Sequence, residues 1–170
     1  MKGDISTLRK VCGYAKSVLF MAFFALAALA ALMAALGAHS FFGGSADLVE
    51  SILPMGPGAP DWERAALVAE SVLVLGMGAA VAGILSRIME SVASEPSPFT
   101  LKNAGLLKAI ALMFLPASAA LFVLELLAGR GPAEAVFVLF GALLVSLVMY
   151  CLTIVFRYGA ALQKESDETL

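Results

Sequence analysis

The sequence predicts an all-α integral membrane protein with four transmembrane helices and with both termini in the cytoplasm. Two observations support this fold class. The mean hydropathy is +0.95 and only 14% of the 170 residues are charged, whereas water-soluble domains carry about 25% charged residues. The apolar residues also gather in four long stretches. Because open sheet edges are not tolerated in lipid, each stretch is predicted to be a helix.

The first span is residues 17–37, SVLFMAFFALAALAALMAALG, which contain no charged side chain. At about 1.5 Å per residue, a helix over this stretch is about 31 Å long and crosses the hydrocarbon core. Basic residues precede it and small residues end it, as in a secretory signal peptide. Its apolar part is longer than the roughly 7–15 residues of such a peptide. A transmembrane helix is therefore predicted here.

Three further spans complete the single predicted domain. They are residues 65–85, interrupted by Glu70; residues 105–128, with Glu125 near one end; and residues 135–156, without charge. The connecting segments are an outer loop at 38–64, a cytoplasmic loop at 86–104, a short turn at 129–134 and a cytoplasmic tail at 157–170.

The basic residues predict the orientation of these spans. With the termini inside, most of the 11 lysines and arginines fall on the cytoplasmic side, as the positive-inside rule requires. These are Lys2, Arg9, Lys10, Lys16, Arg87, Lys102, Lys108, Arg157 and Lys164. Only Arg64 and Arg130 fall outside. Trp62 and the pair Phe41–Phe42 are then expected at the outer interface, where aromatic rings anchor well.

The cytoplasmic loop contains the polar stretch EPSPFTLKN, residues 95–103. Pro96 and Pro98 prevent continuation of the second span. Thr100 is a good N-cap residue, so the third helix is predicted to begin at Leu101. Phe99 precedes the cap. Turn chemistry alone favours a capped elbow between two helices, and a docking site for another protein is the alternative.

Two segments carry a recognisable spacing. In PFTLKNAGLL, residues 98–107, Pro-Phe is followed by Thr, Asn and Leu at fixed intervals between the second and third spans. In FRYGAALQKESDETL, residues 156–170, a basic residue, a glycine, a leucine and an acidic run follow the last span. In both segments the chain resembles the bacterial family catalogued as domain of unknown function 2975. The matching tail positions are Arg157, Gly159, Leu162, Glu165, Asp167 and Thr169. Ser166 and Glu168 depart from that pattern, which has asparagine and leucine there.

The resemblance implies a small four-span protein of the bacterial inner membrane. Members of the family look like companions of a cytoplasmic helix-turn-helix DNA-binding protein. The chain is accordingly expected to be a non-catalytic membrane sensor or tether for such a regulator. Its expected contact residues are Phe99, Thr100, Asn103, Arg157, Gly159, Leu162, Glu165 and Asp167.

The residue types argue against several other classes. Cys12, Cys151 and His39 have no metal-site spacing, and no nucleophile–base set is visible, so neither an enzyme nor a cofactor is predicted. The net charge of −2 gives no basic surface for direct nucleic-acid binding. A structural or immunity-type membrane protein stays open as a further alternative.

Glu70 and Glu125 form the second candidate site, because carboxylates inside a membrane are costly and point to function. Both are predicted in the outer half of the membrane, where they would share a polar pocket with Arg130 or Arg64. In one interpretation Glu70 titrates or binds a cation in a small transporter or channel-like protein. In the other, Glu125 is simply paired with Arg130 at the interface and Glu70 is structural.

Two weaker patterns remain. Ala27, Ala31 and Ala35 recur at four-residue spacing, as do Ala79 and Gly83, which favours close helix packing within the chain, with self-association into a homo-oligomer as the alternative. In the outer loop, SADLVESIL, residues 45–53, predicts a short amphipathic surface helix. The segment PMGPGAP that follows, residues 54–60, predicts an irregular return to Trp62, and the whole loop is a candidate lid over the outer pocket.

Overall fold

The structure of the protein is a computed structural model that describes residues 2–44, 47–53, 59–95 and 97–168. These ranges contain five helices and no strand. The helices are α1 (Lys2–Phe41), α2 (Asp47–Ile52), α3 (Asp61–Ser94), α4 (Leu101–Leu127) and α5 (Pro132–Glu168). Pro96 and Thr169, both used in the sequence predictions, lie outside the described residues.

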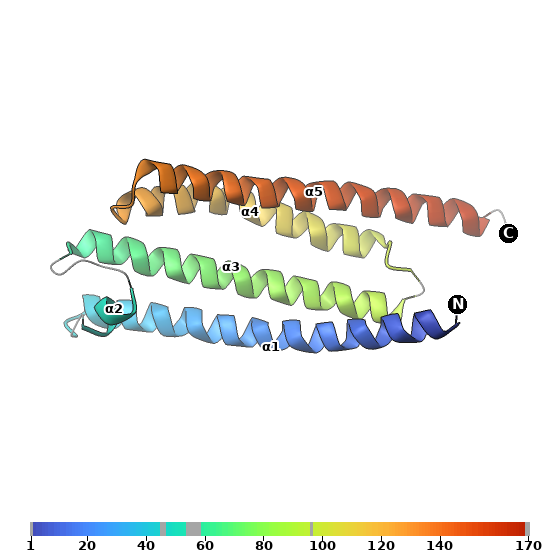
Figure 1. Cartoon of the computed structure of the whole chain (residues 1–170), viewed down its shortest axis with the longest axis horizontal. Coiled ribbons are helices and arrows are strands. Elements are labelled where there is room, and N and C mark those ends of the chain that lie inside the picture. The colour runs from blue at the N-terminus through green and yellow to red at the C-terminus, as the bar shows by residue number, and fades with distance from the viewer. Residues whose placement is uncertain (1, 45–46, 54–58, 96, 169–170) are drawn as a thin grey trace.

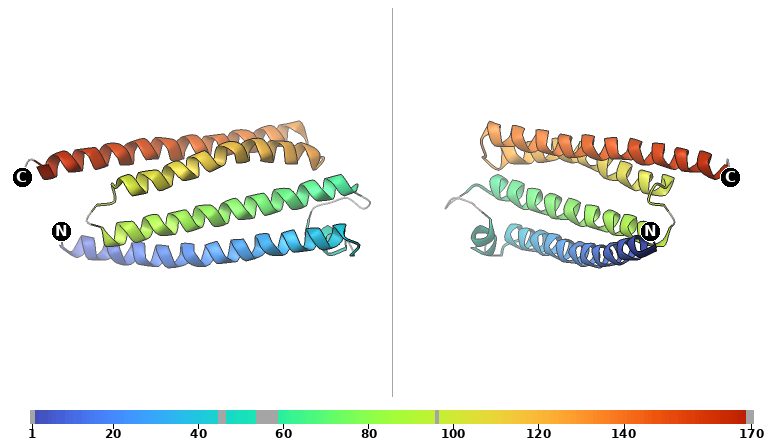
Figure 2. Two further views of the ribbon diagram at one scale, coloured as in Figure 1. Left: turned by 180° about the vertical axis from the view of Figure 1, so that it is seen from behind. Right: turned by 45° about the vertical axis from the view of Figure 1, so that its right-hand side comes forward.

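The four long helices lie side by side in an open row (Figures 1 and 2). Among the described residues, α1 packs against α3, α3 against α4 and α4 against α5, while α1 has no contact with α4 or α5. Both chain termini and the α3–α4 loop lie at one end of the row, called here the termini end. The short helix α2 and the α4–α5 turn lie at the opposite α2 end.

All four predicted spans are helices that are long and apolar enough to cross a membrane, which indicates a multi-pass membrane protein. The helices extend beyond the predicted spans. Helix α1 has 40 residues and α5 has 37, or about 60 Å and 55 Å at the usual rise, against about 30 Å of hydrocarbon core. The predicted tail from residue 157 continues α5 without a break to Glu168.

Large apolar side chains cover the outside of this row. Phe20 and Phe24 on α1 are about half exposed, and Phe137 and Phe140 on α5 are 80% and 64% exposed. Contiguous apolar surface of this kind is unfavourable in water. In lipid it faces a solvent as apolar as itself, so the exposed side chains support the membrane assignment.

Close contacts between α1 and α3 run along most of both helices. Side chains of one helix lie directly over glycines of the other, which lets the two backbones approach. The contacts place Val68 over Gly37, Leu26 near Gly78 and Phe23 near Gly83. The predicted packing role of the alanine repeat in the first span is wrong for Ala31 and Ala35, which are exposed. The larger side chains of Phe23 and Leu26, earlier in the same span, make the contacts with α3 instead.

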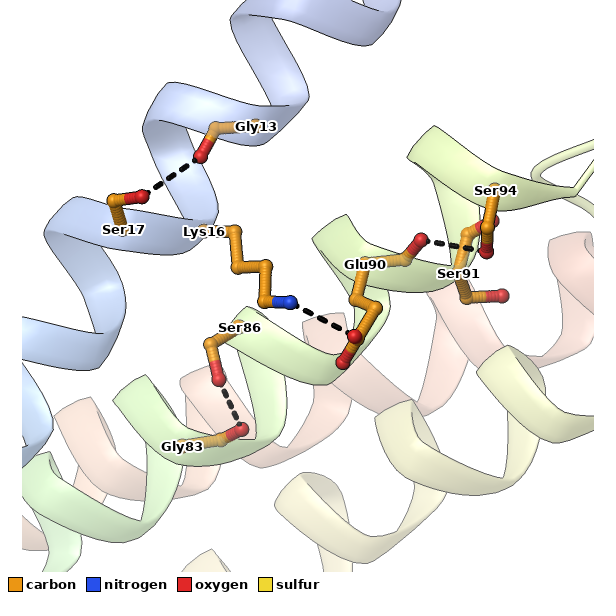
Figure 3. A network of polar contacts seen from close by, with 8 residues as sticks. All are labelled: Gly13, Lys16, Ser17, Gly83, Ser86, Glu90, Ser91 and Ser94. Carbon is orange, nitrogen blue, oxygen red and sulfur yellow. Dashed lines mark hydrogen bonds and ion pairs between the residues drawn. The ribbon is translucent and has the colours of Figure 1, made fainter.

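Toward the termini end, the α1–α3 seam includes one ion pair between the two helices among the residues that Figure 3 labels. Lys16 Nζ donates to Glu90 Oε1 at 2.8 Å, and both side chains are substantially exposed. Such a pair adds little to stability, because water screens exposed charges. Ser17 and Ser86 donate to Gly13 and Gly83 carbonyls of their own helices, which satisfies these hydroxyls without water.

At the α2 end, the predicted surface helix is present as α2. Arg64 at the start of α3 donates to Glu50 of α2 at 2.9 Å and to Asp61 at 3.1 Å. Leu53 packs on the small core formed by Ala66, Leu67 and Ala128. The predicted irregular return and the first residues of the surface helix, at 54–58 and 45–46, lie outside the described residues, so the lid stays a prediction.

Candidate functional site

Three residues predicted to share a polar pocket meet at the α2 end. Arg130 Nη1 donates to Glu125 Oε1 at 2.7 Å and to Glu70 Oε1 at 2.9 Å. Glu70 belongs to α3, Glu125 to the last turns of α4 and Arg130 to the α4–α5 turn. We call these three residues the Glu–Arg–Glu clasp. It joins the α1–α3 pair to the α4–α5 pair, and it contains the predicted pairing of Glu125 with Arg130.

The end of α4 determines where Arg130 lies. Gly129 has φ +71°, a backbone conformation that favours glycine. Its N–H donates to the Leu126 carbonyl, and the Arg130 N–H donates back to the Glu125 carbonyl. These two bonds form a Schellman motif. Because the motif reverses the chain immediately after the helix, the Arg130 side chain returns over Glu125 and reaches Glu70.

The clasp holds more negative than positive charge. Glu125 is 3% exposed, and the side chains of Glu70 and Arg130 are 13% and 34% exposed. Burial alone would lower the pKa of the Arg130 guanidinium, but the hydrogen bonds and charges of Glu125 and Glu70 raise that pKa above its ordinary value. Arg130 therefore stays charged. Among the described residues no donor reaches Oε2 of either glutamate, so one guanidinium serves two buried carboxyl groups.

Two grooves reach the clasp. One of about 500 Å³ is lined by Glu125, Arg130, Glu134 and Phe137. A second of about 340 Å³ is lined by Glu70 together with side chains of α1, α2 and α3. The clasp is therefore accessible on the α4–α5 side through the first groove and on the α1–α3 side through the second, although its side chains are mostly buried.

The second candidate site lies at the termini end, where Phe99 packs on α5. The rings of Phe99 and Phe156 are 5.2 Å apart between centroids and inclined by 61°, an edge-to-face arrangement typical of stabilising aromatic pairs. Phe99 also lies over Gly159, where an added methyl group would approach the ring to 2.8 Å. The structure therefore joins two segments that the sequence predicts as separate contact elements.

Thr100 and Asn103 hold this loop in place. Thr100 is the N-cap of α4, as predicted, and its hydroxyl accepts from the Asn103 N–H at 3.1 Å. Asn103 is fully buried and its Nδ2 donates to the Pro98 carbonyl at 2.9 Å. The predicted partner contact at Asn103 is corrected accordingly, because its side chain is used to tie the loop to the helix and is not accessible.

The remaining predicted contact residues lie on the extension of α5. Arg157, Leu162, Glu165 and Asp167 are exposed. At 100° per residue they point to different sides of the helix, so these four residues do not form a single continuous surface. Gly159 of the predicted tail set lies against the loop, under the Phe99 ring.

Sequence reasoning did not identify Phe156 as the partner of Phe99. A signal for it exists, because Phe156 and Gly159 are three residues apart and share a helix face. Because glycine has no side chain, a second aromatic ring can pack on the helix there, next to the first ring. The Schellman geometry that positions Arg130 was also missed, although a glycine directly after an apolar helix indicates it.

Comparison of the chain with protein-family models, with curated proteins and with solved structures finds no match in any of the three.

Proposed function

We propose that this chain is a non-catalytic protein of the bacterial inner membrane that partners a cytoplasmic helix-turn-helix regulator. It acts either as a tether that holds the regulator at the membrane or as a sensor that signals to it. In this proposal the termini end faces the cytoplasm, in agreement with the distribution of lysine and arginine. The regulator docks on the surface formed by Phe99 and the extension of α5. The resemblance of residues 98–107 and 156–170 to a family with such companions supports the choice of partner.

The observation that carries the proposal is the contact of Phe99 with Phe156 and Gly159. It fixes the loop against a helix that continues about a further 18 Å beyond residue 156 at the usual rise per residue. Phe99 remains 40% exposed and Leu162 on the extension is 49% exposed. A rigid, exposed helix beside a partly exposed aromatic ring is a surface that another protein can recognise.

The test is capture of the regulator from native membranes by the N-terminally tagged chain in mild detergent, followed by mass spectrometry. The full chain is expected to retain a small helix-turn-helix protein. A chain ending after Phe156 and the Phe99→Ala variant are expected to lose it. Phe42→Ala removes an aromatic ring that is 92% exposed at the α2 end and is expected to retain the regulator. Equal capture by the full chain, the shortened chain and Phe99→Ala would contradict the proposal.

A second candidate function rests on the Glu–Arg–Glu clasp. Its two buried Oε2 atoms and its excess of carboxylate over guanidinium favour uptake of a proton or a monovalent cation. No three metal-ligating acidic, histidine or cysteine side chains come together in the described part of the chain, so a tightly held transition metal is not favoured. In this alternative the protein is a small ion- or proton-coupled transporter. Because the helices form an open row, a pathway would require a homo-oligomer.

Glu70→Gln tests this alternative in vesicles containing the purified protein. The substitution keeps the shape of the side chain and removes the charge that titrates. It is expected to abolish any flux of ions or protons that depends on pH, while Glu134→Gln, at an exposed acid beside the clasp, leaves it unchanged. Absence of flux with the wild-type chain, or equal flux with Glu70→Gln, would contradict the transporter.

A further inference from the structure

A groove of about 500 Å³ lies at the termini end between the start of α4 and the extension of α5. Its polar lining consists of Arg157, Tyr158 and Lys164, and its apolar lining includes Leu101 and Ile154. This volume is within the roughly 300–1,000 Å³ that small-ligand sites occupy. The groove is separate from the Glu–Arg–Glu clasp, which is at the opposite end of the row.

The charges in this groove have one sign. Arg157 and Lys164 are seven residues apart, so they lie on one face of α5 about 10 Å apart along its axis. None of the described residues that line the groove is acidic. Lys164 does lie 3.6 Å from Glu168, but both side chains are strongly exposed and such a pair is weak. An anion would therefore find two cations and a phenol on one wall.

The position of the groove along α5 corresponds to the edge of a bilayer. The charge-free stretch of the helix, residues 135–156, ends immediately before Arg157. Ile154 and Val155 are more than half exposed on the apolar side of this boundary, and Tyr158 is 67% exposed on the other. Tyrosine is enriched at this level of a membrane, where its ring is in the interface and its hydroxyl in water.

We infer that this groove binds an anionic phospholipid. Arg157 donates two parallel hydrogen bonds to the phosphate, as its planar guanidinium allows. Lys164 supplies a second positive charge for a negatively charged headgroup, and the Tyr158 hydroxyl donates to a headgroup oxygen. The acyl chains follow Leu101 and Ile154 into the hydrocarbon. A free phosphate would use the same two cations but would leave the apolar wall uncovered.

The site shares Arg157 with the residues predicted to contact the regulator, but it faces away from the contact of Phe99 with Gly159 on which the regulator proposal rests. Arg157, Ala161 and Lys164 share one face of α5 by their helical spacing, whereas Gly159 and Leu162 are turned about 140–160° away. Phe99 covers the Gly159 side. The groove and the Phe99 side of the docking surface therefore lie on different faces of α5, and Phe99→Ala tests the regulator contact without changing a residue that lines the groove.

Native mass spectrometry of the full chain tests the inference, in micelles titrated with phosphatidylglycerol, phosphatidylcholine or inorganic phosphate. We expect the wild-type protein to retain one phosphatidylglycerol molecule at concentrations at which phosphatidylcholine and phosphate are not retained. Each Lys or Arg near an anionic surface contributes enough for about a fivefold change in affinity. The double variant Arg157→Gln/Lys164→Gln is therefore expected to bind phosphatidylglycerol about twenty-fivefold more weakly.

The matched control is Arg9→Gln/Lys10→Gln, which removes two exposed charges from α1 at the same end of the row. It is expected to bind like the wild type. Equal retention of phosphatidylglycerol and phosphatidylcholine would overturn the inference. So would equal weakening in the control variant. Binding of inorganic phosphate that competes with the lipid would replace the phospholipid by a soluble anion and would also overturn it.

Discussion

Arg130→Gln is expected to lower the free energy of unfolding by about 1–3 kcal/mol, the usual cost of leaving a buried acceptor without its donor. The loss is smaller than for a fully buried ion pair, because the Arg130 side chain is 34% exposed. The substitution leaves Glu125, which is 3% exposed, and the largely buried Glu70 without their shared donor. Arg130 is the cation that hydrogen-bonds both carboxylates, so without it their mutual repulsion adds to the cost of burial. The measurement is reversible unfolding of the detergent-solubilised protein followed by circular dichroism.

The origin of this loss can be separated from a loss of packing. The triple variant Glu70→Gln/Glu125→Gln/Arg130→Gln has no charge in the clasp, and it is expected to recover most of the stability that Arg130→Gln loses. Lys16→Gln breaks an exposed pair with Glu90 and is expected to change the stability much less than Arg130→Gln does, because exposed ion pairs are weak. If Arg130→Gln were no more harmful than Lys16→Gln, the clasp would not hold the two helix pairs together.

Gly37→Ala is expected to destabilise the protein by about 1–3 kcal/mol, the typical cost of overpacking a tight contact. A methyl group at this buried glycine of α1 would clash with Cγ1 of Val68 on α3. The β-branched valine has one strongly preferred rotamer in a helix, so it cannot turn away without strain. The helices must therefore separate. The same unfolding measurement reports the loss.

Gly76→Ala on α3 is the matched control, because a methyl group there has no neighbour within 4 Å. Replacement of glycine by alanine inside a helix is by itself favourable by about 1 kcal/mol. Gly76→Ala is therefore expected to be neutral or stabilising. A combined variant, Gly37→Ala/Val68→Ala, relieves the contact and is expected to be more stable than Gly37→Ala. If Gly37→Ala stabilised the chain as Gly76→Ala does, the close α1–α3 contact would be wrong.

The four spans and their order were predictable because each depends on local hydrophobicity and length alone. The start of α4 was predictable as well, since Thr100 follows Pro98 and an N-cap is a local feature. The ends of α1, α3 and α5 were not, because charged residues such as Lys16 and Glu90 interrupt the apolar pattern but are good helix formers. Hydropathy measures where a helix leaves lipid, and the helix itself continues past that point.

The sequence predicted most of the residues of the candidate sites, but it predicted only some of the contacts between them. The cost of carboxylates in a membrane pointed to Glu70 and Glu125. Which arginine pairs with them depended on the turn at Gly129 and on the order of the helices, and Arg64 instead pairs with Glu50 and Asp61. Phe99 was identified by its unusual position, but Asn103 proved to be buried. Long-range contacts of this kind have no signature in the local sequence.

The open row of helices also has a consequence for how the chain is assembled. Helices α1 and α3 form one hairpin and α4 and α5 form another, each from neighbouring spans, and α3–α4 is the one long seam between the hairpins in the described residues. The first hairpin is complete before the second is synthesised. Each can enter the bilayer as a unit, and Arg130 emerges only after α4. Locking of the two halves by the Glu–Arg–Glu clasp is therefore expected as a late step of biogenesis.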